Sequence, residues 1–401
     1  MSAVTELERD VTNLPNGWRR VRLGAVFAER KEKGRVGLPV ASVSIEHGLV
    51  LRSSLDRRVA SDLPPEGHAL VRKGDIAYNM MRMWQGACGL AEADCIISPA
   101  YVVMTPSADV EPVFAHIALR SEPMMSLLHG YSQGIVDDRL RLYSDAFAQV
   151  PINLPPLDEQ RRIAEVLRAV DEAIAANRAA LDQVARARAA ILHSAFEETV
   201  WEPVALGELG SWQSGGTPSK DDESKWGGDV PWVCPRDMKT PVIRQTHSTL
   251  TPLALGGSCK LAPKGTLMIV VRGMILAKAI PTATTAMDAT FNQDMKAFRP
   301  NGRALPKFVQ LCLQHQERQL LRVVNTATHG TKKLDTDTLL TVSVPLPNLE
   351  TQQALADAVS DLDFASVKYG EEHIRLSTIK QALMSDLLSG RVRVPENRKT
   401  L

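Results

Sequence analysis

Two short triplets carry the residue types used in phosphodiester cleavage. Asp237-Met238-Lys239 and Asp294-Met295-Lys296 share a D-x-K spacing, and a nuclease needs clustered carboxylates with a lysine to hold metal ions around a phosphodiester. Triplets of this kind are common by chance. A stand-alone nuclease is therefore the weakest functional hypothesis for this chain, and we predict no catalytic residue and no metal site.

The motifs of cofactor-dependent catalysis are missing from the sequence. A methyltransferase acting on exocyclic amines usually has Asn/Asp-Pro-Pro-aromatic, but Pro64-Pro65 and Pro155-Pro156 each follow a leucine and precede no aromatic residue. Neither G-x-G-x-x-G nor G-x-x-x-x-G-K-[ST] is present, so no Gly-rich loop suits a nucleotide phosphate. We expect a non-catalytic protein with no cofactor of its own.

A further set of polar residues has the chemistry of DNA contact. Flexible glycines and hydroxyls in the segment 214–220 suit phosphate oxygens, and basic residues further along suit phosphates or guanine acceptor atoms. In the first half of the chain, amide and guanidinium groups suit base edges. The candidate DNA-binding residues are Asn79, Arg82, Gln85, Ser214, Thr217, Ser219, Lys220, Arg236, Lys239, Lys332 and Lys333. Each alone also fits a solvated surface residue, so the groups carry the hypothesis.

The elements that must position these residues are organised around a long heptad helix that occurs twice, near 157–197 and near 349–388. The apolar seam of the first copy repeats at intervals of three and four, or a multiple: Ile163, Leu167, Val170, Ile174, Leu181, Val184 and Ile191. Adding 192 to each position gives Leu355, Val359, Leu362, Ser366, His373, Leu376 and Leu383. The same register therefore returns, with some interior positions more polar.

Each copy of the helix has about 40 residues and hence a length of about 60 Å. A helix this long cannot bury its seam alone, so we predict that the two copies pack as an antiparallel coiled coil. Burial is the ordinary explanation of such a stripe. Here it is also the functional one, since the pair would act as a rigid spacer with a globular domain at each end.

The duplication extends into the globular segments. Both open with W-x-x-V-x-L-G, at Trp18–Gly24 and Trp201–Gly207. Strands are expected at 40–45, 74–78 and 101–104 with a helix near 113–128, and again at 230–233, 266–271 and 295–298 with a helix near 306–323. We predict an α/β (α+β) fold with two duplicated domains of mixed, curved sheets. The predicted divisions are 1–153, 154–198, 199–345 and 346–401.

Charge and composition narrow the function further. Residues 201–345 contain 17 Lys and Arg against 12 Asp and Glu, whereas residues 1–154 contain 17 against 18. Basic charge is thus concentrated in one globular segment. Residues 1–10 have no apolar export signal, and the longest apolar stretch is too short to span a bilayer. Five cysteines without a C-x-x-C pair fit a reducing compartment. We expect a cytoplasmic protein that does not bind membranes.

Several motifs together resemble the specificity subunit of type I restriction-modification enzymes, and the resemblance covers nearly the whole chain. Its most specific parts are Leu154-Pro155-Pro156-Leu157-Asp158-Glu159-Gln160 before one long helix and Leu346-Pro347-Asn348-Leu349-Glu350-Thr351-Gln352 before the other. Asn348 and Thr351 depart from the commoner Pro and Glu. Further matches are 214–219 (SGGTPS) with 230–232 (VPW), 78–86 (YNMMRMWQG) with 98–101 (SPAY), and 387–394 (LLSGRVRV).

The resemblance implies two target recognition domains that read a bipartite, asymmetric site in double-stranded DNA. It implies methyltransferase (M) subunits that dock on the helices and methylate adenine with S-adenosylmethionine. It also implies restriction (R) subunits that use ATP and Mg²⁺ to translocate and cleave DNA. The cofactors would belong to these partners, and this chain would direct where they act.

The alternative of a different class is a coiled-coil scaffold whose paired domains bind protein. Such a scaffold would enrich no DNA sequence from a random pool, whereas a specificity subunit would. The target sequence and the spacer length cannot be read from the residues, because base choice depends on side-chain poses.

Overall fold

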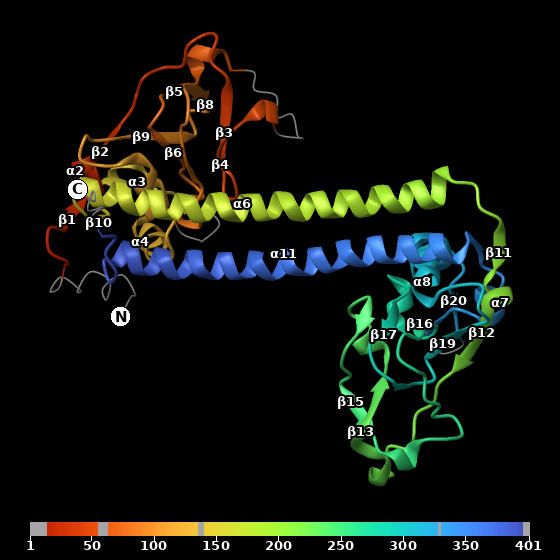
Figure 1. The fold of residues 1–401 in the computed structure, drawn as a ribbon. Coiled ribbons are helices and arrows are strands. Elements are labelled where there is room, and N and C mark those ends of the chain that lie inside the picture. Colours follow the sequence, from red (N-terminus) through yellow and green to blue (C-terminus); the bar gives the residue numbers. More distant parts are fainter. Residues whose placement is uncertain (1–13, 55–62, 135–139, 328–329, 396–401) are drawn as a thin grey trace, which may run out of the picture. The chain divides into compact units, whose positions relative to one another are not determined.

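The computed structural model describes residues 14–54, 63–134, 140–327 and 330–395. The chain forms two compact units: unit 1 comprises residues 1–178 with 371–401, and unit 2 comprises residues 179–370. Both long helices, α6 (Leu157–His193) and α11 (Leu349–Ser389), pass from one unit to the other (Figure 1). Each unit therefore contains a segment of both helices. The four-part division expected from the sequence follows chain order instead, and it stays a prediction.

Residues 1–10, from which the sequence predicts no export signal, lie outside the described residues. Within the described ranges, no helix combines the length and the apolar character needed to cross a bilayer.

Unit 1 contains two four-stranded sheets. One has the order β2 (Phe27–Glu29), β9 (Tyr101–Pro106), β6 (Ile76–Asn79), β7 (Cys88–Leu90), and its strands are antiparallel. The other has the order β4 (Gly48–Leu51), β3 (Val40–Ser44), β8 (Cys95–Ile97), β5 (Ala69–Val71), with β3 and β8 parallel. A separate ribbon joins β1 (Arg19–Arg22) to β10 (Pro151–Leu154), so the strand that opens the domain pairs with the strand that leads into α6.

Unit 2 repeats this arrangement. A five-stranded sheet has the order β12 (Gly210–Ser214), β19 (Met295–Pro300), β16 (Leu267–Val270), β17 (Thr282–Thr285), β14 (Val242–Ile243). Beside it, β13 (Trp226–Val233) pairs antiparallel with β15 (Ser248–Leu250) and parallel with β18 (Thr290–Phe291). The opening ribbon joins β11 (Pro203–Ala205) to β22 (Ser343–Pro345), and a short ribbon joins β20 (Asn325–Thr326) to β21 (Lys332–Lys333).

The two units share one topology. In each, an opening ribbon leads through a short helix, α2 (Leu23–Val26) or α7 (Leu206–Leu209), into a sheet in which the second strand pairs with a later, central strand. The V-x-L-G part of both opening motifs becomes the end of the ribbon strand and this helix. The expected mixed α/β fold with duplicated domains is confirmed, and the sheet order adds evidence of duplication that the residues alone did not provide.

Each single helix expected after the central strand is broken in two. Unit 1 has α3 (Pro112–Leu119) and α4 (Glu122–Tyr131), because Pro123 in the first turn of α4 cannot continue a preceding helix. Unit 2 has α8 (Pro306–His315) and α9 (Glu317–Arg322), with Gln316 between them donating from its side chain to the Ser343 carbonyl. The remaining short helices are α5 (Ser144–Gln149) and α10 (Thr336–Leu340).

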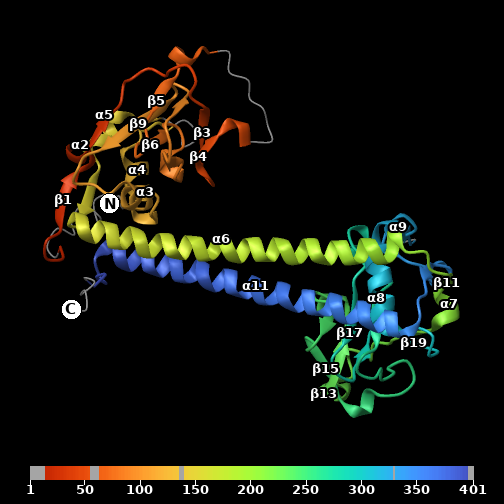
Figure 2. The same cartoon turned by 45° about the horizontal axis from the view of Figure 1, so that its top comes forward.

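The long helices are built into the cores of both units. In unit 1, Ile163, Leu167 and Leu387 pack with Phe114 and Leu127. There Asp171 pairs with Lys380 at 2.5 Å and Glu159 with Arg393, so the two helix segments run antiparallel (Figures 1 and 2). In unit 2, α8 lies against the first part of α11. Leu355 of α11 and Phe196, three residues beyond the end of α6, pack on the core that holds Phe308.

Candidate nucleic-acid interface

The loop after β12 in unit 2 is held in place by close packing of its glycines. A Cβ at Gly215 would lie 2.1 Å from the Phe291 carbonyl oxygen, and one at Gly216 would lie 2.4 Å from Ser258 Oγ. The Gly216 amide donates to the Phe291 carbonyl at 2.9 Å, and Trp232 Nε1 donates to the Gly216 carbonyl at 3.1 Å. These glycines therefore permit close approach of the backbone; the flexibility expected from the sequence is not their role here.

The hydroxyls of this loop are differently engaged. Ser214, the last residue of β12, is exposed, whereas half-buried Thr217 hydrogen-bonds the side chain of Gln293. Ser219 and Lys220 are exposed, and the Ser219 carbonyl accepts from Trp226 Nε1 at 3.0 Å. The loop thus presents Ser214 and Lys220 outward from a fixed backbone.

A cavity of about 500 Å³ opens beside this loop. Lys220 and Arg236 line it with Trp226 and Trp232, whose rings meet edge to face with centroids 5.2 Å apart. Arg236 is exposed in the turn after β13 and makes a long contact of 3.4 Å to Ser248 Oγ. Cationic groups beside aromatic rings suit a phosphate and a base at once. Lys239 lies three residues beyond Arg236 and is exposed outside the cavity lining.

The two lysines on β21 are not equally available. Lys333 Nζ lies 2.5 Å from Asp335 Oδ1, and this hydrogen bond with the lysine lowers the pKa of Asp335. Lys332 Nζ donates to the Thr326 hydroxyl at 2.9 Å and has no ion pair among the described residues. Lys332 is therefore the stronger candidate for a phosphate contact.

The carboxylates of the D-x-K triplets serve the fold. Asp237 accepts from the Cys234 amide at 2.9 Å and from the His247 amide at 3.0 Å, which caps a turn. Asp294 accepts from the Asn292 side chain at 3.2 Å. Across the part of the chain that the structure describes, no group of three His, Cys, Asp or Glu side chains could hold a metal ion.

In unit 1 the candidate residues lie in the segment after β6. Asn79 Oδ1 accepts from the Met81 amide at 2.9 Å, so its side chain helps form the turn. Arg82 is exposed and approaches Gln85 only at 3.5 Å, which leaves both groups available to another partner. Trp84 supports the segment through its Nε1 bond to the Met81 carbonyl. Arg82 and Gln85 are thus better placed than Asn79 to read a base edge.

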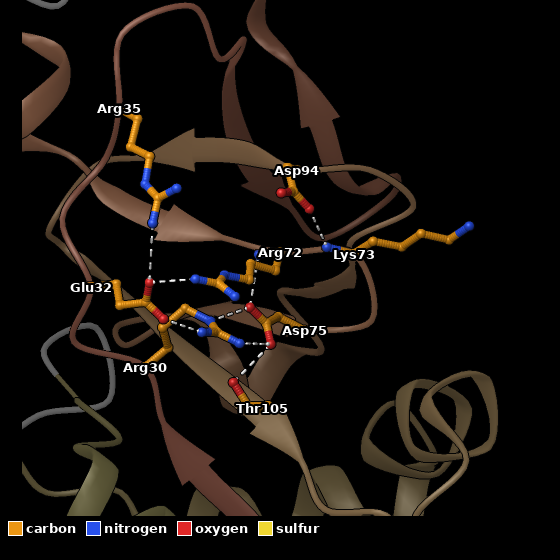
Figure 3. A network of polar contacts seen from close by, with 8 residues as sticks. All are labelled: Arg30, Glu32, Arg35, Arg72, Lys73, Asp75, Asp94 and Thr105. Atoms are coloured by element: carbon orange, nitrogen blue, oxygen red, sulfur yellow. Dashed lines mark hydrogen bonds and ion pairs between the residues drawn. The ribbon is translucent and has the colours of Figure 1, made fainter.

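A polar network anchors the other end of β6 (Figure 3). Buried Asp75 accepts from Arg30 Nε at 2.6 Å, from the Arg72 amide at 2.8 Å and from the Thr105 hydroxyl at 2.8 Å. The hydrogen bonds with Asp75 raise the pKa of Arg30, and those with Arg30 and Arg72 lower the pKa of Glu32. A buried carboxylate with these donors is satisfied. The network links β2, β6 and β9. It thereby fixes the strand β6 that leads to Arg82.

The turn before β6 has an equivalent in unit 2. The Lys73 amide donates to Asp94 at 2.9 Å, and the Lys264 amide donates to Asp288 at 2.8 Å. Gly74 and Gly265 follow with φ of 91° and 85°, a conformation that favours glycine. By this equivalence, the exposed Arg272 just after β16 corresponds to the segment that holds Arg82. Sequence reasoning missed Arg272, although the repeated Lys-Gly pair pointed to it.

The seam residues of the long helices are buried or half-buried throughout. Ile163, Leu167 and Val359 are buried, and the others are half-buried: Val170, Ile174, Leu181, Val184, Ile191, Leu355, Leu362, Leu376 and Leu383. Asn177, which falls within the seven-residue gap between Ile174 and Leu181, is also buried. The polar seam positions are therefore not confined to the second copy. That the whole seam forms one continuous helix pair stays a prediction.

Comparisons of the sequence with known proteins match it to DNA specificity domains and specificity subunits. The family model "Type I restriction modification DNA specificity domain" matches residues 103–186 and 198–373, more than half of the chain. The EcoR124I/EcoR124II specificity subunit of Escherichia coli is 34% identical over 170 residues, which are 42% of each chain. The HindI specificity subunit of Haemophilus influenzae is 21% identical over 82% of this chain and 89% of that one.

A solved structure has the same fold. The type I restriction-modification S subunit from M. genitalium superposes with a TM-score of 0.57 at 15% identity, covering 94% of this chain and 97% of that one. The match to the E. coli relative spans less than half of that protein's length, whereas this structural likeness extends over nearly all of both chains.

Proposed function

The chain belongs to the type I restriction-modification DNA specificity family, and from this we propose that each of its two units reads one half of a bipartite, asymmetric DNA site. The single observation that best supports two readers is the shared topology of the units combined with different side chains at equivalent places. Arg82 and Gln85 follow β6 in unit 1, whereas Arg272 follows the equivalent strand β16 in unit 2. Different groups at one position of one scaffold suit different base sequences.

Within each unit, the proposed division of labour follows side-chain chemistry. In unit 2, Arg236 and Lys220 beside the two tryptophans would contact bases and the adjoining backbone, and Ser214, Thr217, Ser219, Lys239, Lys332 and Lys333 would position the DNA through phosphates. In unit 1, Arg82 and Gln85 would read bases, with Asn79 shaping their turn. The chain carries no catalytic centre; it would decide where catalysis takes place.

The partners of a specificity subunit are DNA and the modification and restriction subunits. In our proposal, M subunits dock on the outer faces of α6 and α11 and supply S-adenosylmethionine, and R subunits add ATP- and Mg²⁺-dependent cleavage in the cytoplasm. Exposed Phe364, Val367 and Ile374 of α11 fit such a contact, because large apolar side chains on a helix surface favour a protein partner.

Methylation mapping tests the proposal. Co-expression of the full chain with its methyltransferase subunit should place methyladenine in two specific half-sites separated by a non-specific spacer of constant length. A single continuous site, or random methylation, would contradict two readers. A coiled-coil scaffold, the second candidate, predicts that the assembled complex selects no sequence from a random DNA pool.

A helix insertion tests the spacer role separately. About one extra turn inserted at the same level in α6 and α11 should change the spacer between the half-sites and leave both half-sites intact. Unchanged spacing in an assembled, active complex would exclude the helices as the ruler, whether or not the units read DNA.

A further inference from the structure

Lys296 has an unusual environment for a lysine. It lies on β19 and is only 9% exposed. Its Nζ donates to Ser214 Oγ at 3.0 Å, and the two residues are direct cross-strand partners at the end of β12. Because Ser214 is exposed, the buried lysine stem leads its ammonium group to the solvent edge of the sheet.

The ammonium group of Lys296 has no acidic partner in the described part of the chain. Among the described residues, no carboxylate lies within ion-pair distance of Lys296; Asp294, two residues earlier, bonds Asn292 instead. The charged neighbour is Lys333, another cation, and burial together with Lys333 lowers the pKa of Lys296. Lys307 of the same unit is also partly buried, but it has Asp363 nearby. A buried cation without a counter-ion is costly, so this site is poised to take an anion.

The hydroxyl beside Lys296 is fixed by the loop that follows it. Gly215 packs against the Phe291 carbonyl, so Ser214 cannot retreat from the lysine. Ser214 Oγ accepts from Lys296 Nζ, which leaves its own hydrogen to donate outward. Lys333, whose charge acts on Lys296, forms a backbone β-bridge with exposed Arg272, so the chain beside the site is basic. An oxygen that approaches Ser214 would meet two donors, the Ser214 hydroxyl and the Lys296 ammonium group.

We propose that Lys296 and Ser214 bind one non-bridging oxygen of a DNA backbone phosphate in the half-site read by unit 2. This inference rests on the proposed function and adds Lys296, for which sequence reasoning proposed no DNA contact, to the phosphate contact predicted for Ser214. Such a contact sets the position of the duplex on the unit without selecting a base. The loop 214–219 would then lie between this phosphate and the cavity of Arg236, with Gly216 bonded to Trp232 of that cavity.

The test uses the complete complex of this chain with its methyltransferase subunit. The DNA carries the target sequence that methylation mapping identifies. Single phosphates of the second half-site are replaced by neutral methylphosphonates, one position at a time. Wild-type affinity should fall about tenfold at one position, the effect expected of a charge-assisted hydrogen bond. Lys296→Met should bind unmodified DNA about tenfold more weakly, lose sensitivity at that same position, and show a salt slope smaller by about one. If Lys296 and Ser214 bound a free anion and no DNA phosphate, Lys296→Met would respond to each methylphosphonate position as wild type does.

Matched variants separate this role from a structural one. Lys296→Met keeps the apolar stem and removes a buried charge, so its unfolding midpoint should equal or exceed that of wild type. Ser214→Ala should share its position-specific effect, whereas Lys307→Met should bind DNA and respond to every methylphosphonate as wild type does. Wild-type sensitivity at all positions in Lys296→Met, or loss of DNA affinity only in parallel with unfolding, would overturn the proposal. A wild-type complex that selects no DNA sequence would instead contradict the proposed function itself.

Discussion

Gln160 and Gln352 make the same three hydrogen bonds in their separate units. Gln160 Nε2 donates to the Pro155 and Asp109 carbonyls while its Oε1 accepts from the Glu111 amide. Gln352 Nε2 donates to the Pro347 and Arg303 carbonyls while its Oε1 accepts from the Leu305 amide. Both residues are fully buried. The glutamine that ends each Pro-rich lead-in thus ties the start of a long helix to the loop before α3 or α8.

Removal of one of these glutamines should loosen that joint. Gln352→Ala leaves the Leu305 amide and two carbonyls without their partner, which should cost about 3 kcal/mol of unfolding free energy, since each unsatisfied buried group costs roughly 1–3 kcal/mol. Urea unfolding and hydrogen exchange at the Leu305 amide measure the loss. The neighbouring Gln353 is exposed, and its side chain donates a hydrogen bond to Asp357, so Gln353→Ala should stay within about 0.5 kcal/mol of wild type. If the two variants lower the unfolding free energy equally, the three hydrogen bonds of Gln352 do not stabilise the unit.

The C-terminal segment should depend on one ion pair. Arg393 donates from both Nε and its NH2 group to buried Glu159, which also accepts from Trp18 Nε1 at 3.1 Å. Arg393→Ala would leave Trp18 Nε1 as the one remaining side-chain donor to this carboxylate among the described residues. Because Arg393 is partly exposed, we expect a loss of about 2 kcal/mol, below the range for fully buried pairs. Faster proteolytic cleavage after residue 389 in Arg393→Ala than in wild type would reveal this loss of stability.

The control for this prediction is two residues away. Arg391 pairs with Asp386 at the surface, so Arg391→Ala should change stability by less than about 1 kcal/mol. If Arg393→Ala and Arg391→Ala are cleaved at the same rate as wild type, the pair with Glu159 does not hold the segment.

Acid should weaken unit 1 through His116. Burial, and secondly the Arg120 guanidinium, lower the pKa of His116 to about 4; Lys380 also lowers it, while a bond to the Cys88 backbone and the charge of Asp171 oppose the shift. The unfolded value is about 6.5. As pH falls, the unfolded chain therefore binds the proton first. His116 leaves the unfolding free energy unchanged above about pH 6.5 and lowers it as pH drops towards 4, by at most about 3 kcal/mol.

Urea unfolding between pH 7 and pH 4.5 measures this dependence. His116→Gln should be less sensitive to pH than wild type, whereas His47→Gln, which changes an exposed histidine of the same unit, should follow the wild-type curve. If the unfolding free energy of His116→Gln depends on pH as that of wild type does, His116 is not the cause of the acid sensitivity.

The lysines of β21 should affect salt dependence more than base choice. The variant Lys332→Ala with Lys333→Ala should weaken DNA binding by the complex and flatten the plot of log affinity against log salt. We expect the slope to change by about one, as for one phosphate, because Asp335 already neutralises Lys333. Arg318→Ala with Arg322→Ala removes the same charge from exposed positions of α9 and should leave the slope nearly unchanged. A slope equal to wild type in the lysine variant would place these residues away from phosphate.

The sequence by itself determined the duplication, the two long helices and the family. Heptad spacing, the two Pro-rich lead-ins and the repeated opening motif are local patterns, and their meaning does not depend on distant residues. For the same reason, the strands of β3, β6, β9, β13, β16 and β19 were expected close to their observed positions.

Only the tertiary structure decided which polar groups are available. Ser214 and Lys296 are 82 residues apart, and their contact depends on the register between β12 and β19, which no local pattern encodes. The same holds for Lys333, whose charge Asp335 offsets, and for Gly215, whose role follows from the Phe291 carbonyl beside it. A residue's type sets the chemistry that it can do. Its neighbours across the sheet decide whether that chemistry is free for DNA.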